Sequence, residues 1–180
     1  FASTEYLGDS RLIGEIKARF PRALLFGCST AGEIQQTRVF DDTLVLTAVE
    51  FEHTTLRTAK VEARSVAGSL DAGVQLARQL PAAGLRHVFV LSDGLMINGT
   101  DLVKGLAEAL PAGVGITGGL AGDGGRFKET LVLSGGRAET GGVTALGFRA
   151  LGLRDTIETF AAACEANWIR SYEPDTWQRI

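Results

Sequence analysis

Apolar residues in the first 80 positions follow first a helical and then a strand-like pattern. Four of them have helical spacing and precede a proline that ends the run: Leu12, Ile13, Ile16 and Phe20, then Pro21. A continuous apolar run at residues 23–26 predicts a short strand covered on both faces, and residues 42–51 and 54–63 predict a hairpin. A second helical face is formed by Val66, Leu70, Val74 and Ala77.

The same succession of elements returns after residue 86. Residues 87–91, with the sequence His-Val-Phe-Val-Leu, predict a buried strand. A helix is predicted next, with an inward face of Leu102, Val103, Leu106 and Leu110 before Pro111. Residues 114–116 predict a short strand, and residues 129–134 and 142–148 an antiparallel pair across Gly135-Gly136. Strands that alternate with helices and hairpins predict an α/β or α+β sandwich with a mixed sheet.

Matching residues at a constant shift indicate an internal duplication. Four residues recur 90 positions later (102 − 12): Leu12, Pro21, Ala31 and Gly32 match Leu102, Pro111, Ala121 and Gly122, and the acids Glu33 and Asp123 match in kind. Thr43-Leu44-Val45-Leu46 recurs as Thr130-Leu131-Val132-Leu133, 87 positions later (130 − 43). Because one such unit cannot bury its apolar face alone, two tandem pseudo-equivalent repeats should pack together, with their turns near a shared pseudo-twofold axis.

These repeats define the expected domain organisation. One domain of residues 1–149 contains repeats at about 1–66 and 87–149, and residues 150–180 form a tail that belongs to neither repeat. Phe1-Ala2-Ser3 aligns with Leu91-Ser92-Asp93, the end of a strand in the second repeat. We therefore expect the first strand to be truncated.

Composition excludes several classes of function. Charged residues make up 22% of the chain and the net charge is −3, which gives no electrostatic basis for nucleic-acid binding. Cys28 and Cys164 lie in unlike contexts, so they indicate neither a disulfide framework nor a metal site and favour a reducing compartment. No apolar run approaches the ~20 residues that a membrane-spanning helix needs.

The first small-residue turn, Gly27-Cys28-Ser29-Thr30-Ala31-Gly32-Glu33, has three functional interpretations. A nucleophilic Cys28 needs a base, and the two histidines are His53, in a turn, and His87, at the start of a strand. A phosphate cradle needs the lysine and spacing of a P-loop, which the turn lacks. A small-ligand pocket would use backbone N–H groups, hydroxyls and an acid that accepts an ammonium. Alternatively, the glycines only permit tight turns and close packing.

A second dense stretch, residues 92–99, follows the buried strand. Asp93 stands at the carboxyl end of that strand, the place where α/β sheets bind ligands. Otherwise Asp93 and Asn98 only order the loop before the next helix. The candidate ligand-binding residues are Cys28, Ser29, Thr30, Glu33, Asp93, Asn98, Gly118, Gly119 and Asp123. We expect no catalytic residue, metal or cofactor.

Three ordered motifs resemble the N-terminal FIST domain (F-box and intracellular signal transduction proteins). They are FGCSTAGEI at 26–34, LSDG at 91–94 with Asn98-Gly99, and TGGLAGD at 117–123, extended by Phe127 and residues 130–133. The resemblance covers about residues 1–148. It implies a non-catalytic sensory input domain, found in bacterial signalling proteins beside outputs such as histidine kinases and chemotaxis receptors. It also implies a cytoplasmic location and a small polar ligand, with amino acids proposed.

We therefore interpret the chain as a sensor that binds a small polar metabolite between its two repeat turns and acts on a signalling output domain or protein. We expect no nucleic acid and no membrane contact by this segment. Two alternatives stay open at this point. One is a cysteine-dependent hydrolase or transferase that uses Cys28, which requires a nearby histidine. The other is an interaction module without a ligand, which would lack a concave pocket.

Overall fold

The computed structural model describes residues 1–62 and 65–150. The tail of residues 151–180 lies outside this part of the chain. The helices are α1 (Thr4–Gly8), α2 (Ser10–Arg19), the 3-10 turn η1 (Val66–Gly68), α3 (Ser69–Gln79) and α4 (Gly99–Ala109). The strands are β1 (Phe26–Cys28), β2 (Glu33–Gln35), β3 (Arg38–Phe40), β4 (Thr54–Glu62), β5 (Leu85–Ser92), β6 (Gly115–Leu120), β7 (Val132–Ser134), β8 (Arg137–Glu139) and β9 (Gly142–Ala150).

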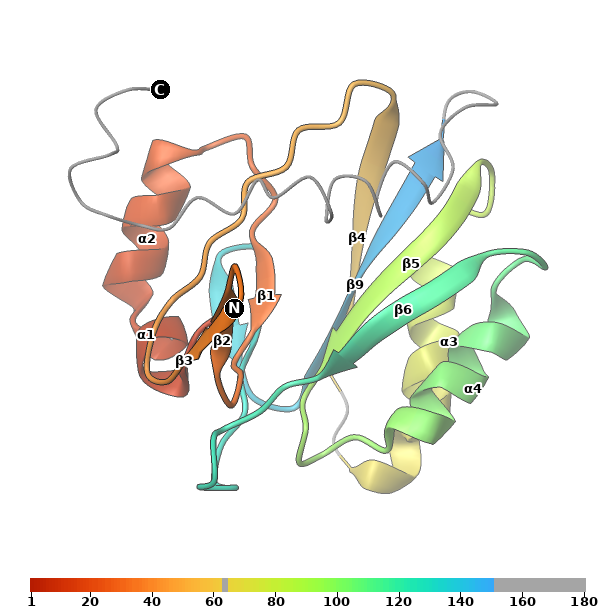
Figure 1. The fold of residues 1–180 in the computed structure, drawn as a ribbon. Coiled ribbons are helices and arrows are strands. Elements are labelled where there is room, and N and C mark those ends of the chain that lie inside the picture. Colours follow the sequence, from red (N-terminus) through yellow and green to blue (C-terminus); the bar gives the residue numbers. More distant parts are fainter. Residues whose placement is uncertain (63–64, 151–180) are drawn as a thin grey trace.

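The larger sheet has the strand order β4-β9-β5-β6. β5 and β6 are parallel, whereas β9 runs antiparallel to both β4 and β5. Helices α3 and α4 cover one face of this sheet (Figure 1). The core between them contains Leu76, Leu106, Val88 and Val143, which are fully buried. Sheet and helices together confirm the expected mixed α+β architecture.

A smaller body packs beside the first. Its sheet has the order β1-β7-β8, and α1 and α2 lie against it (Figure 1). The apolar core of this body contains Ala2, Leu7, Ile13, Leu131 and Leu133. A third cluster of Cys28, Leu91, Ala121 and Val132 links the two sheets. The two bodies therefore meet through buried apolar contacts.

Local sequence signals predicted several elements correctly. Helix α2 starts where expected, because the Asp9 carboxylate accepts hydrogen bonds from the N–H groups of Arg11 and Leu12. Strand β5 and helix α4 are also confirmed, with Asn98 as the N-cap of α4. The predicted α4 face was wrong at Val103, whose side chain is 46% exposed.

Strand pairing was predicted less well. The expected hairpin of residues 42–51 with 54–63 does not form, because β4 pairs along its whole length with β9. Residues 42–51 form no strand, and within them Leu44 makes an isolated antiparallel bridge to Ala2. Likewise β7 turns across Gly135-Gly136 into β8 instead of into β9. Both differences arise because β9 fits between β4 and β5 in the larger sheet.

The directions of strand pairing agree with the predicted duplication in one respect. Ala2 bridges Ser29 in parallel and Leu44 in antiparallel fashion, and β5 likewise pairs in parallel with β6 and antiparallel with β9. Superposition of the two halves remains the test of duplication. Among the described helices, none is both long and apolar enough to cross a membrane.

Candidate functional site

The two small-residue turns lie against each other where the two sheets meet. The N–H of Gly122 donates to the carbonyl oxygen of Ser29 at 2.8 Å. A Cβ atom added at Gly122 would lie 3.0 Å from the nitrogen of Ala31, so the backbones are in close contact. We call the contact of residues 29–33 with residues 121–123 the junction. This close approach of the two backbones explains why both turns consist of small residues.

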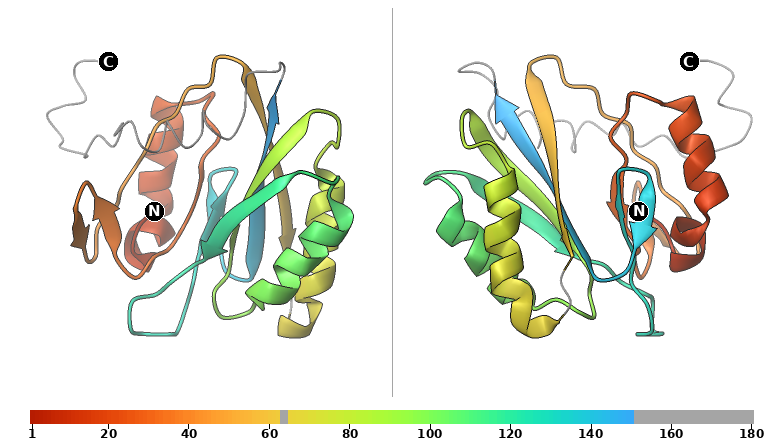
Figure 2. Two further views of the ribbon diagram at one scale, coloured as in Figure 1. Left: turned by 45° about the vertical axis from the view of Figure 1, so that its right-hand side comes forward. Right: turned by 180° about the vertical axis from the view of Figure 1, so that it is seen from behind.

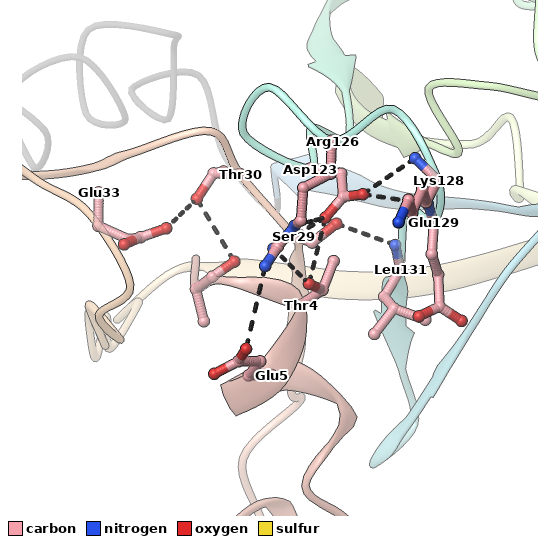
Figure 3. A network of polar contacts seen from close by, with 11 residues as sticks. Thr4, Glu5, Ser29, Thr30, Glu33, Asp123, Arg126, Lys128, Glu129 and Leu131 are labelled. Carbon is pink, nitrogen blue, oxygen red and sulfur yellow. Dashed lines mark hydrogen bonds and ion pairs between the residues drawn. The ribbon is translucent and has the colours of Figure 1, made fainter.

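Ser29 ties the junction to strand β7 and is fully buried. Its N–H donates to the carbonyl oxygen of Leu131 at 2.8 Å, and its Oγ accepts from the N–H of Leu131 at 2.9 Å. Figure 3 shows this pair beside the acids of the junction. Because the N–H group and the Oγ atom of Ser29 are both hydrogen-bonded within the protein, this residue orders the turn.

Glu33 has a side chain that points back into its own turn and is 1% exposed. Oε1 accepts from the Thr30 hydroxyl at 2.6 Å. Oε2 accepts from the hydroxyl and the N–H of Thr43, at 2.7 and 3.0 Å. A carboxylate has about four acceptor positions, so one position on Oε1 stays unused by these bonds.

Asp123 is the matching acid of the second turn, and its side chain is 4% exposed. Oδ2 accepts from the N–H groups of Lys128 and Glu129, both at 3.1 Å. Oδ1 accepts from the Thr4 hydroxyl at 3.2 Å and from Nε of Arg126 at 2.9 Å (Figure 3). All four acceptor positions are therefore occupied.

The charge of Asp123 is stabilised by these donors. Burial acts to raise the pKa of Asp123, but the N–H groups of Glu129 and Lys128 and the Arg126 guanidinium outweigh it and hold the pKa below its usual range. Arg126 also donates from Nη2 to the Thr4 hydroxyl at 2.8 Å. Its Nη1 lies 3.9 Å from Oε1 of Glu5. The guanidinium is thus held in place while 42% of the side chain stays exposed.

Asp93 closes the loop after β5 and is 2% exposed. Oδ1 accepts from the N–H groups of Leu95 and Met96 at 2.8 and 2.7 Å, and Oδ2 accepts from the N–H of Gly141 at 2.9 Å. Burial acts to raise the pKa of Asp93, but these backbone donors and the Thr130 hydroxyl hold it below its usual range. This carboxylate therefore joins the β5 loop to the turn before β9.

Cys28 is 2% exposed and lies among Leu91, Ala121 and Val132. Burial raises the pKa of the thiol to about 11. His87 bonds through Nε2 to the Thr117 hydroxyl at 2.7 Å, and burial lowers the pKa of this imidazole. His53 is mostly exposed, and its Nε2 lies 3.7 Å from Oε2 of Glu52. At neutral pH the thiol is therefore overwhelmingly protonated, which disfavours a nucleophilic role.

The remaining candidates lie toward the edge of the larger sheet. Asn98 is exposed, and its side chain accepts from the N–H of Asp101 at 3.1 Å at the start of α4. Gly118 and Gly119 are exposed on β6. A Cβ atom at Gly118 would lie 1.8 Å from the carbonyl oxygen of Val90, so close strand packing explains that glycine.

The structure thus brings five of the nine candidates into one polar network and leaves four outside it, namely Cys28, Asn98, Gly118 and Gly119. Ser29, Thr30, Glu33, Asp93 and Asp123 are linked through turns and through residues 130–131. Sequence reasoning missed the partners of these acids, which are Thr4, Thr43, Arg126 and Thr130. Thr43 and Thr130 did have a signal, since both belong to the stretch that recurs at a shift of 87. Within residues 1–62 and 65–150, no group of three or more His, Cys, Asp or Glu could hold a metal ion.

Comparison with known proteins identifies the family. No curated protein is similar enough in sequence to count as a relative. The family model described as the FIST N domain matches residues 1–163, beyond the 148 residues of the motif resemblance. Because this match spans most of the 180 residues, the chain belongs to the FIST N domain family, a family of sensory domains in signal transduction proteins.

Proposed function

We propose that this chain is the ligand-binding input domain of a signalling protein and that its small polar ligand, an amino acid, binds at the junction. One observation carries the proposal. Two small-residue turns from different parts of the chain meet there, at the line where the two sheets join. A ligand between these turns contacts both bodies at once, so it is placed to alter their relative position.

Hydrogen-bond capacity ranks the acids of the proposed site. Asp123 accepts at all four positions, and Asp93 accepts from three N–H groups and the Thr130 hydroxyl, whereas Glu33 retains one position. Glu33 belongs to the junction itself and is therefore our choice for the ammonium of an amino acid. The hydroxyl of Thr30 and the turn N–H groups would donate hydrogen bonds to the carboxylate of the amino acid, and Cys28 and Ser29 would line the bottom of the binding site.

Binding to Glu33 also supplies a signalling mechanism. Because this side chain is 1% exposed, a ligand reaches it only after a rearrangement, and we propose that in this rearranged state the two turns have separated. A ligand shifts an equilibrium by the difference in its affinity for the two arrangements. Ligand would therefore favour the separated arrangement, and an attached output domain or partner protein would sense it. The cysteine-enzyme alternative has no comparable support, because the buried Cys28 thiol has a pKa of about 11.

A calorimetric titration of the purified chain against the common amino acids tests this function, after a thermal-shift screen selects the ligand. Losing a buried charged partner commonly costs several kcal/mol, so Glu33→Gln should weaken binding by ~100-fold or more. Asp123→Asn is the matched control, an equally buried acid without a free acceptor position, and should change affinity less than ~10-fold. Circular dichroism verifies that each variant folds. No binding of any amino acid, or equal loss in both variants, would contradict the proposal.

A further inference from the structure

The outer edge of β6 lacks the features that keep sheet edges apart. In the described part of the chain, β6 pairs with β5 alone and ends the sheet. Its sequence, Gly-Ile-Thr-Gly-Gly-Leu, contains no charge and no proline, and residues 117–120 are exposed. The opposite edge strand, β4, carries Arg57, Lys60 and Glu62. Because charged residues on an edge oppose pairing with another strand, β4 is protected and β6 is not.

Strand β1 shows how a comparable edge is completed in this molecule. β1 is also short and uncharged, with the sequence Phe-Gly-Cys, and it follows a helix and a proline as β6 does. β7 pairs antiparallel with β1, with Gly27 opposite Leu133. β7 belongs to a hairpin whose two strands of three residues are joined by Gly135-Gly136. Leu133 is only 7% exposed, because its side chain packs in the cluster with Ala2, Leu7 and Ile13.

The β2–β3 hairpin has the same build but no such partner strand. Two strands of three residues are joined by Gln36-Thr37, and Ile34 lies directly opposite Val39. Ile34 is 64% exposed and Val39 66%. In the described residues these two strands pair only with each other. The hairpin projects from the molecule, well separated from β6 (Figure 2, left).

We propose that two copies of this chain associate by reciprocal strand addition, in which β2 of each copy pairs antiparallel with β6 of the other. Each copy has one hairpin without a partner strand and one unprotected edge. Two copies can therefore pair both hairpins with both edges, and the dimer closes with twofold symmetry. The inference goes beyond the ligand-binding function and does not depend on it.

The register follows from the completed edge. Thr117 lies 90 positions after Gly27 (117 − 27), the same shift that relates the small-residue turns after these two positions. Ile34 occupies the centre of β2, as Leu133 occupies the centre of β7. Since Leu133 lies opposite Gly27, Ile34 should lie opposite Thr117 of the second copy. The root of the hairpin is held in its own chain by the bonds from Thr30 and Thr43 to Glu33, which favours a second copy over its own β6.

Disulfide trapping tests the partner and the register together. In a Cys164→Ser background, Ile34→Cys and Thr117→Cys variants of the full chain are purified separately, mixed and oxidised. We expect the mixed disulfide dimer, identified by mass spectrometry. The control mixture replaces Ile34→Cys with Val66→Cys, another exposed apolar position at 48% against 64%, and should give at least tenfold less dimer. A monomeric internal disulfide in the Ile34→Cys/Thr117→Cys chain, or equal yields in both mixtures, would overturn the proposal.

Sedimentation velocity over a concentration series provides the second measurement. The wild-type chain should show a reversible dimer, and Ile34→Lys should weaken the dimer at least tenfold without affecting the monomer fold, because this side chain is mostly exposed. Circular dichroism of the variant checks the fold. A wild-type chain that stays monomeric up to the highest concentration, or a dimer that Ile34→Lys does not weaken, would also overturn the inference.

Discussion

Asp93, Glu33 and Asp123 each lose the solvation of a charge on burial, and each regains it from donors inside the protein. The sequence predicted that Asp93 directly follows a strand and that Glu33 and Asp123 end small-residue turns. It could not reveal their bonding, since the donors to Asp93 include Gly141, 48 residues away, and those to Asp123 include Thr4, 119 residues away. The positions of the three acids along the chain were therefore predictable from the sequence, whereas the number of donors that each one binds was not.

Asp93→Asn tests the residue with the most backbone donors. The variant should lower the free energy of unfolding at pH 7 by roughly 2–3 kcal/mol, because an amide cannot accept three N–H bonds as a carboxylate does. The pKa of Asp93 is lower in the folded than in the unfolded chain, so its contribution is present above the unfolded value of about 3.9. That contribution is lost as the pH falls through the folded value.

Urea denaturation at pH 7 and at several values below pH 4 measures this difference. The gap between wild type and Asp93→Asn should narrow as the pH falls. Glu108→Gln, at an exposed position of α4, serves as the control and should change stability by less than about 0.5 kcal/mol at pH 7. A gap of constant size down to pH 2.5 would show that the carboxylate charge is not what stabilises the loop.

Among the elements, those with a strong local signal were predicted and those defined by distant partners were not. Helix α2 follows from apolar spacing and the Asp9 cap, and β5 from its uninterrupted apolar run. The partner of β4 is β9, about 90 residues later in the chain, and no local pattern specifies that choice. The exposure of Val103 has a similar origin, because the inward face of α4 is set by its contact with α3.

The contact of α3 with α4 depends on two glycines. A Cβ atom at Gly105 would lie 2.0 Å from the carbonyl oxygen of Leu70, and one at Gly73 would lie 2.3 Å from that of Leu102. Gly105→Ala should therefore force the helices apart and lower the free energy of unfolding by about 3 kcal/mol. Gly14→Ala, in α2 with open space around the position, should stabilise the chain by up to about 1 kcal/mol. Denaturation monitored by circular dichroism measures the free energy of unfolding of both variants. Changes of the same sign in Gly105→Ala and Gly14→Ala would contradict this interpretation.

At the scale of the whole molecule, the junction is where a backbone hydrogen bond, from Gly122 to Ser29, joins the two turns. The paired turns were expected from the repeat shift, and their contact is confirmed by the bond from Gly122 to Ser29. The sequence could not predict how closely the backbones approach, because that distance depends on both sheets. The junction itself is made of small residues and lies beside the apolar cluster of Cys28, Leu91, Ala121 and Val132, so a modest change there should alter the coupling of the bodies before it unfolds either one.

Gly122→Ala is the substitution that tests this coupling. The added Cβ would lie 3.0 Å from the nitrogen of Ala31, so the turns must separate by a few tenths of an ångström. We expect a loss of about 1 kcal/mol in stability, together with faster hydrogen exchange at the amides of Gly122 and Leu131. Amides of β4 and β9 should keep their protection, since their ladder lies within one body. Gly125→Ala is the matched control in the same loop, with open space around its Cβ, and should leave both measurements unchanged. Exchange that accelerates uniformly over both sheets would mean that the bodies unfold together and that the junction is not a separable contact.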